Sequence, residues 1–100
     1  MTSEPFTLNG KKFEGYVIPI GPVSLVFASA EHGLVGCGAI DVIALEKFQI
    51  PAAKVRPVST PSVSSIAELL SGEIVVVNQY AQAAGITLGM SGKDALLRLS

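Results

Sequence analysis

One thiol and one imidazole are the side chains of this chain best suited to chemistry. Cys37 is the only cysteine and His32 the only histidine, and they lie five positions apart. A cysteine with a histidine base is the minimum arrangement for nucleophilic catalysis by a thiol. The pair is therefore a candidate catalytic site for acyl transfer or hydrolysis of a small amide or thioester, with Cys37 as nucleophile and His32 as base.

The residues around Cys37 could supply backbone donors to a ligand. Gly36 and Gly38 flank the cysteine and leave the backbone N–H groups open, because glycine has no Cβ. Asp41 follows at a predicted helix start, where the first N–H groups have no partner within the helix. Such groups can hold a carboxylate, a phosphate or a developing oxyanion. Gly36, Gly38 and Asp41 are therefore candidate binding residues for a small anionic ligand.

Each candidate residue also has a purely structural interpretation. Cys37 could be a small buried hydrophobic side chain, since free cysteine is among the most buried residue types. His32 could be a solvated turn residue, and Asp41 could only cap a helix. No metal site is expected, because these three residues lack a paired spacing such as C-x-x-C, and no cofactor is expected either. The sequence leaves the catalytic and the structural interpretations open.

Four antiparallel strands are predicted to position these residues. Asn9-Gly10 is a strong hairpin signal, since both turn residues tolerate positive φ, and Gly21-Pro22 breaks the chain again. His32 falls in a third turn, and a tight hairpin would place it across that turn from Cys37, a few strand positions away. The predicted strands cover residues 6–8, 13–18, 23–28 and 34–38.

Helices and strands are mixed in the rest of the chain. Asp41 is predicted to cap a helix that ends near Gln49, and Thr60-Pro61 to begin another that ends at Gly72. The near-continuous apolar run 73–77 indicates a strand buried on both faces. The remaining predicted elements are a strand at 54–58, a helix at 78–84 and a last helix from Ser91 through Leu99. This order indicates an α+β fold in a single domain, residues 1–100.

Composition limits the class of protein. Hydrophobic residues make up 49% of the 100 residues, charged residues 15%, and the net charge is −1. Nucleic-acid recognition needs clustered Lys and Arg, and disorder needs low hydrophobicity with high net charge, so both are excluded. Residues 15–40 carry a single charge, Glu31. This region is therefore a candidate surface for self-association, because obligate interfaces resemble a domain core.

The cysteine content and the apolar run indicate a compartment. A lone cysteine forms no intrachain disulfide, which favours the cytoplasm. The uncharged run 15–30 is shorter than a membrane-spanning helix, and Pro19, Gly21 and Pro22 interrupt it. No membrane association is expected.

Two separated motifs carry a resemblance to a known family. They are Gly36-Cys37-Gly38-Ala39-Ile40-Asp41-Val42 and, nearer the C-terminus, Ala84-Gly85-Ile86 with Gly89-Met90-Ser91-Gly92-Lys93-Asp94-Ala95-Leu96. With these motifs the chain resembles, along nearly its whole length, the YunC-like family of uncharacterised bacterial and archaeal proteins, a domain of unknown function. The resemblance implies an α+β domain whose N-terminal β region, residues 1–40, mediates formation of a tetramer. It implies no activity.

Two hypotheses for the function follow from these observations. The first is a non-enzymatic homo-oligomer, a tetramer built through the N-terminal sheet, that binds a small ligand or a protein partner. The alternative is a small enzyme that uses Cys37 as nucleophile at a helix N-terminus. A weaker third interpretation makes the same thiol a redox or ligand sensor.

Overall fold

The N-terminal part of the molecule is a run of antiparallel strands. The computed structural model describes residues 2–58 and 60–100. The strands are β1 (Thr2–Leu8), β2 (Lys11–Ile20), β3 (Val23–Ser29) and β4 (Leu34–Gly36), each antiparallel to the one before it. Asn9 and Gly10 both have positive φ, 52° and 80°, as a two-residue hairpin turn requires. The prediction of four antiparallel strands is confirmed.

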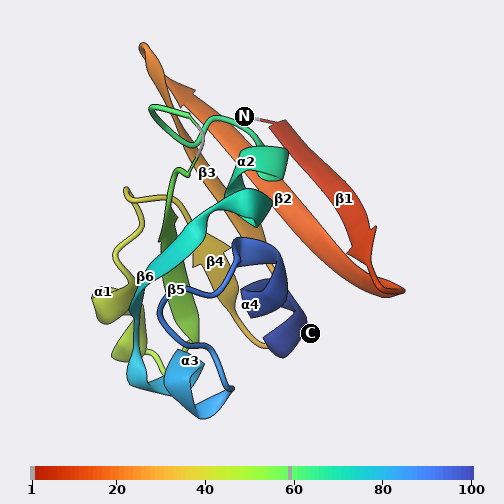
Figure 1. Ribbon diagram of the computed structural model, residues 1–100, viewed down its shortest axis with the longest axis vertical. Helices are drawn as coiled ribbons and strands as arrows, with labels where there is room; N and C mark the ends of the chain where they lie inside the picture. The colour runs from red at the N-terminus through yellow and green to blue at the C-terminus, as the bar shows by residue number, and fades with distance from the viewer. Residues whose placement is uncertain (1, 59) are drawn as a thin grey trace.

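The C-terminal part mixes helices with the last two strands. Helix α1 (Val42–Glu46) crosses from β4 to β5 (Ala52–Arg56), which is parallel to β4. The chain continues through α2 (Ile66–Ser71), β6 (Glu73–Val77), α3 (Gln79–Ala83) and α4 (Gly92–Arg98). All six strands form one sheet in the order β1-β2-β3-β4-β5-β6 (Figure 1). The α+β class predicted from the order of elements is confirmed.

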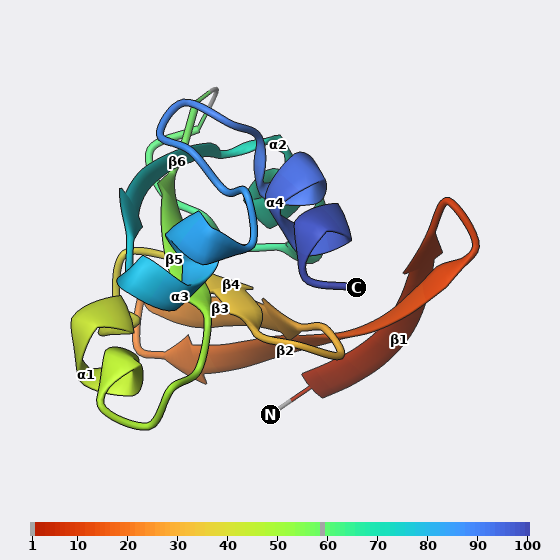
Figure 2. The same cartoon turned by 90° about the horizontal axis from the view of Figure 1, so that it is seen from below.

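The core lies between the sheet and two helices. Figure 2 shows α2 and α4 on one side of β2 and β3, and no helix of the described chain on the other side of these two strands. Val26, Ala28 and Val35 point towards the helices and are fully buried. Leu69 of α2 and Leu96 of α4 pack against them and are also fully buried. None of the helices in the described ranges is long and apolar enough to cross a membrane.

The predicted start of the second helix is wrong. Helix α2 begins at Ile66, and the Oγ atom of Ser65 accepts the Glu68 N–H at 3.2 Å as the N-cap. The Thr60 hydroxyl instead donates to the carbonyl of Ser62 at 2.8 Å within the preceding loop. Ser65 has the same capping chemistry as Thr60 and stands directly before the apolar positions that face the core. The predicted end at Gly72 is confirmed.

Strand β6 is not buried on both faces as its apolar sequence predicted. Ile74 is 1% exposed, whereas Val75 is 38% exposed. The physical reason is position, because β6 is an edge strand of the sheet. Its outer edge is occupied by the loop after α3: the Ile74 N–H donates to Met90 O and the Gly89 N–H donates to Ile74 O, both at 2.8 Å.

The other edge of the sheet is β1, and a proline interrupts it. In a two-residue hairpin the residues that flank the turn form a hydrogen-bonded pair, here Leu8 and Lys11. Alternation along the strand then turns the backbone groups of Ser3, Pro5 and Thr7 towards the open edge. Pro5 has no N–H to donate, so this edge lacks one donor in its middle.

A buried amide joins α1, β5 and α3. Asn78, the N-cap of α3, is 1% exposed and was predicted only as a helix start. Its Oδ1 accepts the N–H groups of Ala52 at 3.2 Å and Ala81 at 3.0 Å. Its Nδ2 donates to the carbonyls of Val42 at 3.0 Å and Ile50 at 2.8 Å. All four hydrogen-bonding positions of the side chain are therefore used.

Candidate functional site

Cys37 lies directly after β4 with its thiol against β3. The residue is 6% exposed and belongs to the hydrophobic core. Its Sγ accepts the Val26 N–H at 3.4 Å, and its own N–H donates to Val26 O at 2.9 Å. Beside it is a shallow cavity of about 260 Å³ whose walls include Val23, Pro57 and Val63. Cys37 thus packs as a core residue at the floor of a small, mainly apolar cavity.

The last residue of β4 and the turn that follows it carry the other residues predicted to bind a ligand. A Cβ atom on Gly36 would overlap the side chain of Ile40, so close packing accounts for this glycine. Gly38 is exposed, and a Cβ there would meet no atom within 4 Å. Asp41 caps α1 as predicted, because its Oδ1 accepts the Ala44 N–H at 2.9 Å. The side chain of Asp41 is thus engaged in holding a helix of five residues.

His32 lies at the other end of β4 from Cys37. Its side chain is 65% exposed, its backbone N–H donates to Leu99 O at 2.9 Å, and its Nε2 is 4.0 Å from the carboxylate of Glu31. His32 borders a separate cavity of about 370 Å³ that also includes Gln49. Gly33 and the three residues of β4 stand between His32 and Cys37, and the strand alone has a length of roughly 10 Å. The structure therefore does not bring the imidazole and the thiol together.

The described residues contain no cluster of three or more His, Cys, Asp or Glu side chains that could hold a metal ion. His32, Cys37 and Asp41 are each engaged in different surroundings, as described above. The end of β4 and the turn after it thus present a packed thiol, two glycines and a helix cap.

The uncovered side of β2 and β3 is apolar. Tyr16 and Phe27 are cross-strand partners whose rings stack with centroids 4.7 Å apart and an interplanar angle of 17°. At the end of the two strands, the partners Ile20 and Val23 are 53% and 54% exposed. Together with Ile18, these residues alternate along the strands on the side away from α2 and α4. We call this set, Tyr16, Ile18, Ile20, Val23 and Phe27, the open face.

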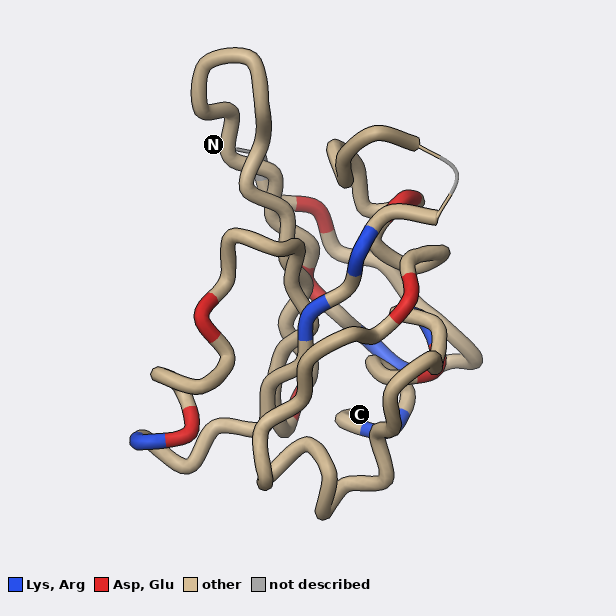
Figure 3. The backbone as a smooth tube through the Cα atoms, turned by 60° about the vertical axis from the view of Figure 1, so that its left-hand side comes forward, with Lys and Arg blue, Asp and Glu red and all other residues tan. Residues whose placement is uncertain are grey.

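The open face coincides with the part of the chain that has almost no charge. Figure 3 shows the β2–β3 turn and the adjoining parts of both strands as a long stretch without Lys, Arg, Asp or Glu, and this uncharged stretch covers residues 15–30. The low charge of residues 15–40 predicts a surface for self-association, and all five residues of the open face belong to this region.

Sequence reasoning missed a second group of residues at the opposite end of β2. Lys11, Lys12 and Glu14 border a cavity at the point where β2 extends beyond β3. The only sequence signal was the concentration of charge in the first fourteen residues, followed by none up to residue 30. The cavity itself depends on the strand register, which the sequence does not state.

Known proteins are similar to this chain along nearly its full length. A family model described as a domain of unknown function (DUF1805) matches residues 36–99. The uncharacterized protein YunC of Bacillus subtilis (strain 168) is 27% identical over 95 residues, which cover 95% of this chain and 93% of that protein. A protein of unknown function from Thermoplasma acidophilum, TA1206, has a crystal structure of the same fold. The TM-score is 0.87 and the identity 22%, over 99% of this chain and 92% of that chain.

Proposed function

Because the chain belongs to the DUF1805 family and is a YunC-like domain of unknown function, we propose a function from its surface rather than from a relative's activity. The proposal is a non-enzymatic homo-oligomer that assembles through the open face and presents binding surfaces for a ligand or partner. A tetramer is the stoichiometry that the family resemblance implies. The cytoplasm is the proposed compartment, supported by the lone cysteine.

The observation that carries the proposal is the open face itself. Two stacked aromatic rings and the exposed side chains of Ile20 and Val23 lie on a side of β2 and β3 that no described helix covers. Contiguous apolar surface of this kind is uncommon on proteins that stay monomeric. The open face of a second copy is apolar in the same places, so face-to-face packing of the two open faces would bury no charged residue of the set.

Face-to-face packing is favoured over pairing between strand edges. The outer edge of β6 is hydrogen-bonded to the loop at Gly89 and Met90. The outer edge of β1 has Pro5 at an outward position, where an added strand would find no donor. The sheet therefore offers an apolar face for assembly and two edges that resist it.

No observation favours a second function at Cys37. Its thiol accepts a backbone hydrogen bond from Val26, and His32 lies at the other end of β4. The alternative of a cysteine-nucleophile enzyme is therefore not proposed.

Light scattering coupled to size-exclusion chromatography tests the assembly. At micromolar concentration the wild-type chain should elute as an oligomer of the 10.3 kDa protomer. Ile20→Glu should weaken association by about tenfold or more, because it replaces an apolar contact of about 1.5–3 kcal/mol with a charge. Ile43→Glu is the matched control, since Ile43 is equally exposed at 53% but lies on α1.

Three results would overturn the proposal. A wild-type chain that stays at 10.3 kDa would remove oligomerisation altogether. If Ile20→Glu forms the same oligomer as wild type, the interface is not at the open face. If only Ile43→Glu dissociates the oligomer, the interface lies elsewhere on the molecule.

A further inference from the structure

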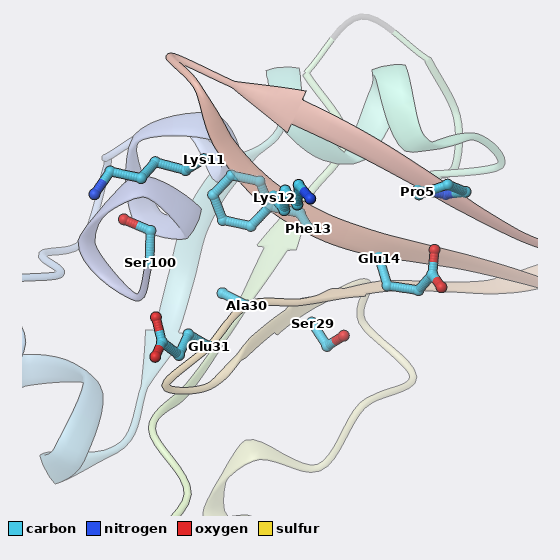
Figure 4. A pocket seen from close by; sticks show the side chains of 9 residues that line it. All are labelled: Pro5, Lys11, Lys12, Phe13, Glu14, Ser29, Ala30, Glu31 and Ser100. Atoms are coloured by element: carbon cyan, nitrogen blue, oxygen red, sulfur yellow. The ribbon is translucent and has the colours of Figure 1, made fainter.

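β2 is longer than β3, and its overhanging end borders a cavity. Pairing between the two strands ends at Glu14 opposite Ser29, so Lys11 and Lys12 extend past their neighbouring strand. The space between this overhang and the turn after β3 is a cavity of about 550 Å³ (Figure 4). Small-molecule sites in proteins commonly enclose about 300–1,000 Å³. The cavity is thus large enough for a small metabolite.

Charged side chains of both signs border this cavity. Lys11, Lys12 and Glu14 come from β2, and Glu31 comes from the turn after β3. Figure 4 shows Lys11 and Glu31 towards one end of the cavity and Glu14 towards the other. Within the described part of the chain, neither lysine nor Glu14 forms an ion pair within 4.0 Å, and Glu31 is 4.0 Å from His32. The two ammonium groups and the Glu14 carboxylate are therefore free to meet a ligand.

The carboxylate of Glu14 lacks a partner although it is partly removed from water. Its Oε2 atom is buried and has no hydrogen-bond partner among the described residues. Removing a carboxylate oxygen from water without a compensating hydrogen bond costs free energy. A cation held against the accessible side of this group would offset that cost, because an opposite charge stabilises the ionised form.

The backbone of Lys12 adds a donor and an acceptor to the same wall. Strand β2 begins and ends at a two-residue turn. The residues on either side of these turns pair with each other, Leu8 with Lys11 at one end and Ile20 with Val23 at the other. This register turns the even-numbered residues of β2 towards β3. Lys12 is even-numbered but lies past the end of β3, so its N–H and C=O have no strand partner.

We propose that this cavity binds a small zwitterion of the amino-acid or dipeptide type. The Lys12 ammonium group, which leaves the same side of β2 as Glu14, holds the ligand's carboxylate, Glu14 holds its ammonium group, and the Lys12 backbone hydrogen-bonds the part between the two charges. A ligand with a single charge would pair either with the lysine or with Glu14 and would leave the other group without a partner. None of the five residues that define the open face borders the cavity.

Backbone amide shifts of the ¹⁵N-labelled full chain test this site, with glycylglycine as the probe. The amides of Lys12, Ala30 and Glu31 should shift and saturate during the titration. Acetate and methylammonium, which carry one charge each, should bind about tenfold or more weakly, because each forgoes a charge-assisted hydrogen bond. Absence of saturable shifts, or equal binding of acetate, would overturn the proposal.

Paired variants separate the site from general effects of charge. Glu14→Gln should weaken glycylglycine binding about tenfold and leave acetate binding unchanged, since it removes only the partner of the ammonium group. Glu4→Gln is the control, because Glu4 lies on the neighbouring strand β1 and does not border the cavity. Lys12→Gln should weaken both glycylglycine and acetate. If Glu14→Gln and Lys12→Gln both bind glycylglycine as tightly as wild type, the assignment is refuted. The amide spectra also report whether each variant is folded.

Discussion

Asn78→Ala should be one of the most destabilising single substitutions in this protein. The side chain accepts two backbone N–H groups and donates to two carbonyls, and these belong to residues from α1 to α3. Alanine at this position keeps the backbone but removes all four hydrogen bonds at once. The substitution therefore releases three neighbouring segments from a common partner.

The expected loss follows from the groups left behind. A side-chain hydrogen bond contributes about 1 kcal/mol net, so four of them amount to about 4 kcal/mol. Ala52 and Ala81 are fully buried, so their N–H groups would lose their acceptor without gaining water. A domain of this size is stable by about 5–15 kcal/mol, so the loss removes a large share of it.

Urea unfolding followed by circular dichroism measures this loss. With a slope of about 1.5 kcal/mol per molar urea, a loss of about 4 kcal/mol lowers the midpoint by about 2–3 M. The protein concentration is held constant, because association would raise the apparent stability. Gln79→Ala is the control: Gln79 is the next residue, it is exposed, and its change should stay within about 0.5 kcal/mol.

Asn78→Asp probes the same network with almost the same shape. It retains the acceptor but places an oxygen against the carbonyls of Val42 and Ile50, and burial raises the pKa of the introduced carboxyl group. A pKa that is higher in the folded state makes the variant most stable at low pH, and this stability is lost as the pH rises. A loss below about 1 kcal/mol for Asn78→Ala, or no pH dependence for Asn78→Asp relative to wild type, would refute the reasoning.

Two more predictions concern a helix cap and a carboxylate, and a third concerns the thiol. Asp41→Ala removes the acceptor of the Ala44 N–H and should lower the free energy of unfolding by about 1 kcal/mol in the urea assay; an unchanged midpoint would contradict the cap. Side-chain and backbone hydrogen bonds from Ser64 lower the pKa of Glu68 below its ordinary value of 4.5, so this carboxylate stabilises the fold above that value and ceases to do so as the pH falls. Thermal melts should therefore show Glu68→Gln less stable than wild type near pH 7 and equal to it near pH 3, and a constant difference would count against the sign. Iodoacetamide should alkylate Cys37 far more slowly in the folded protein than in urea, because the residue is 6% exposed, and mass spectrometry showing equal rates would contradict its burial.

Short-range signals in the sequence were sufficient for the turns and for two of the caps. The Asn9-Gly10 hairpin, the Asp41 cap and the Ser91 cap all involve atoms within three residues of each other. Local chemistry of this kind is visible in the order of residue types. Local chemistry led to the wrong cap at Thr60, because Ser65 can cap a helix equally well and only packing against the sheet selects between the two residues.

The rest depends on contacts between distant parts of the chain. Asn78 bonds to residues 26, 28 and 36 positions away, so its role could not be inferred from its neighbours. The exposure of Val75 follows from the place of β6 at the end of the sheet, which the apolar run could not indicate. The charged cavity exists because β2 extends beyond the end of β3. How far one strand extends past another depends on the register of the pair, so neither strand's sequence alone could indicate it.

The two edges of the sheet, one interrupted by a proline and the other covered by a loop, affect how the chain behaves at high concentration. Hydrophobic residues make up 49% of the sequence, and long β-rich segments of low charge are prone to stack into amyloid fibrils. Fibril growth adds strands along the hydrogen-bonding direction, which requires an edge with free donors and acceptors. Here the Gly89–Met90 loop occupies one edge and Pro5 interrupts the other. Growth by strand addition is disfavoured in both directions, so an apolar sheet can remain in solution without seeding aggregates.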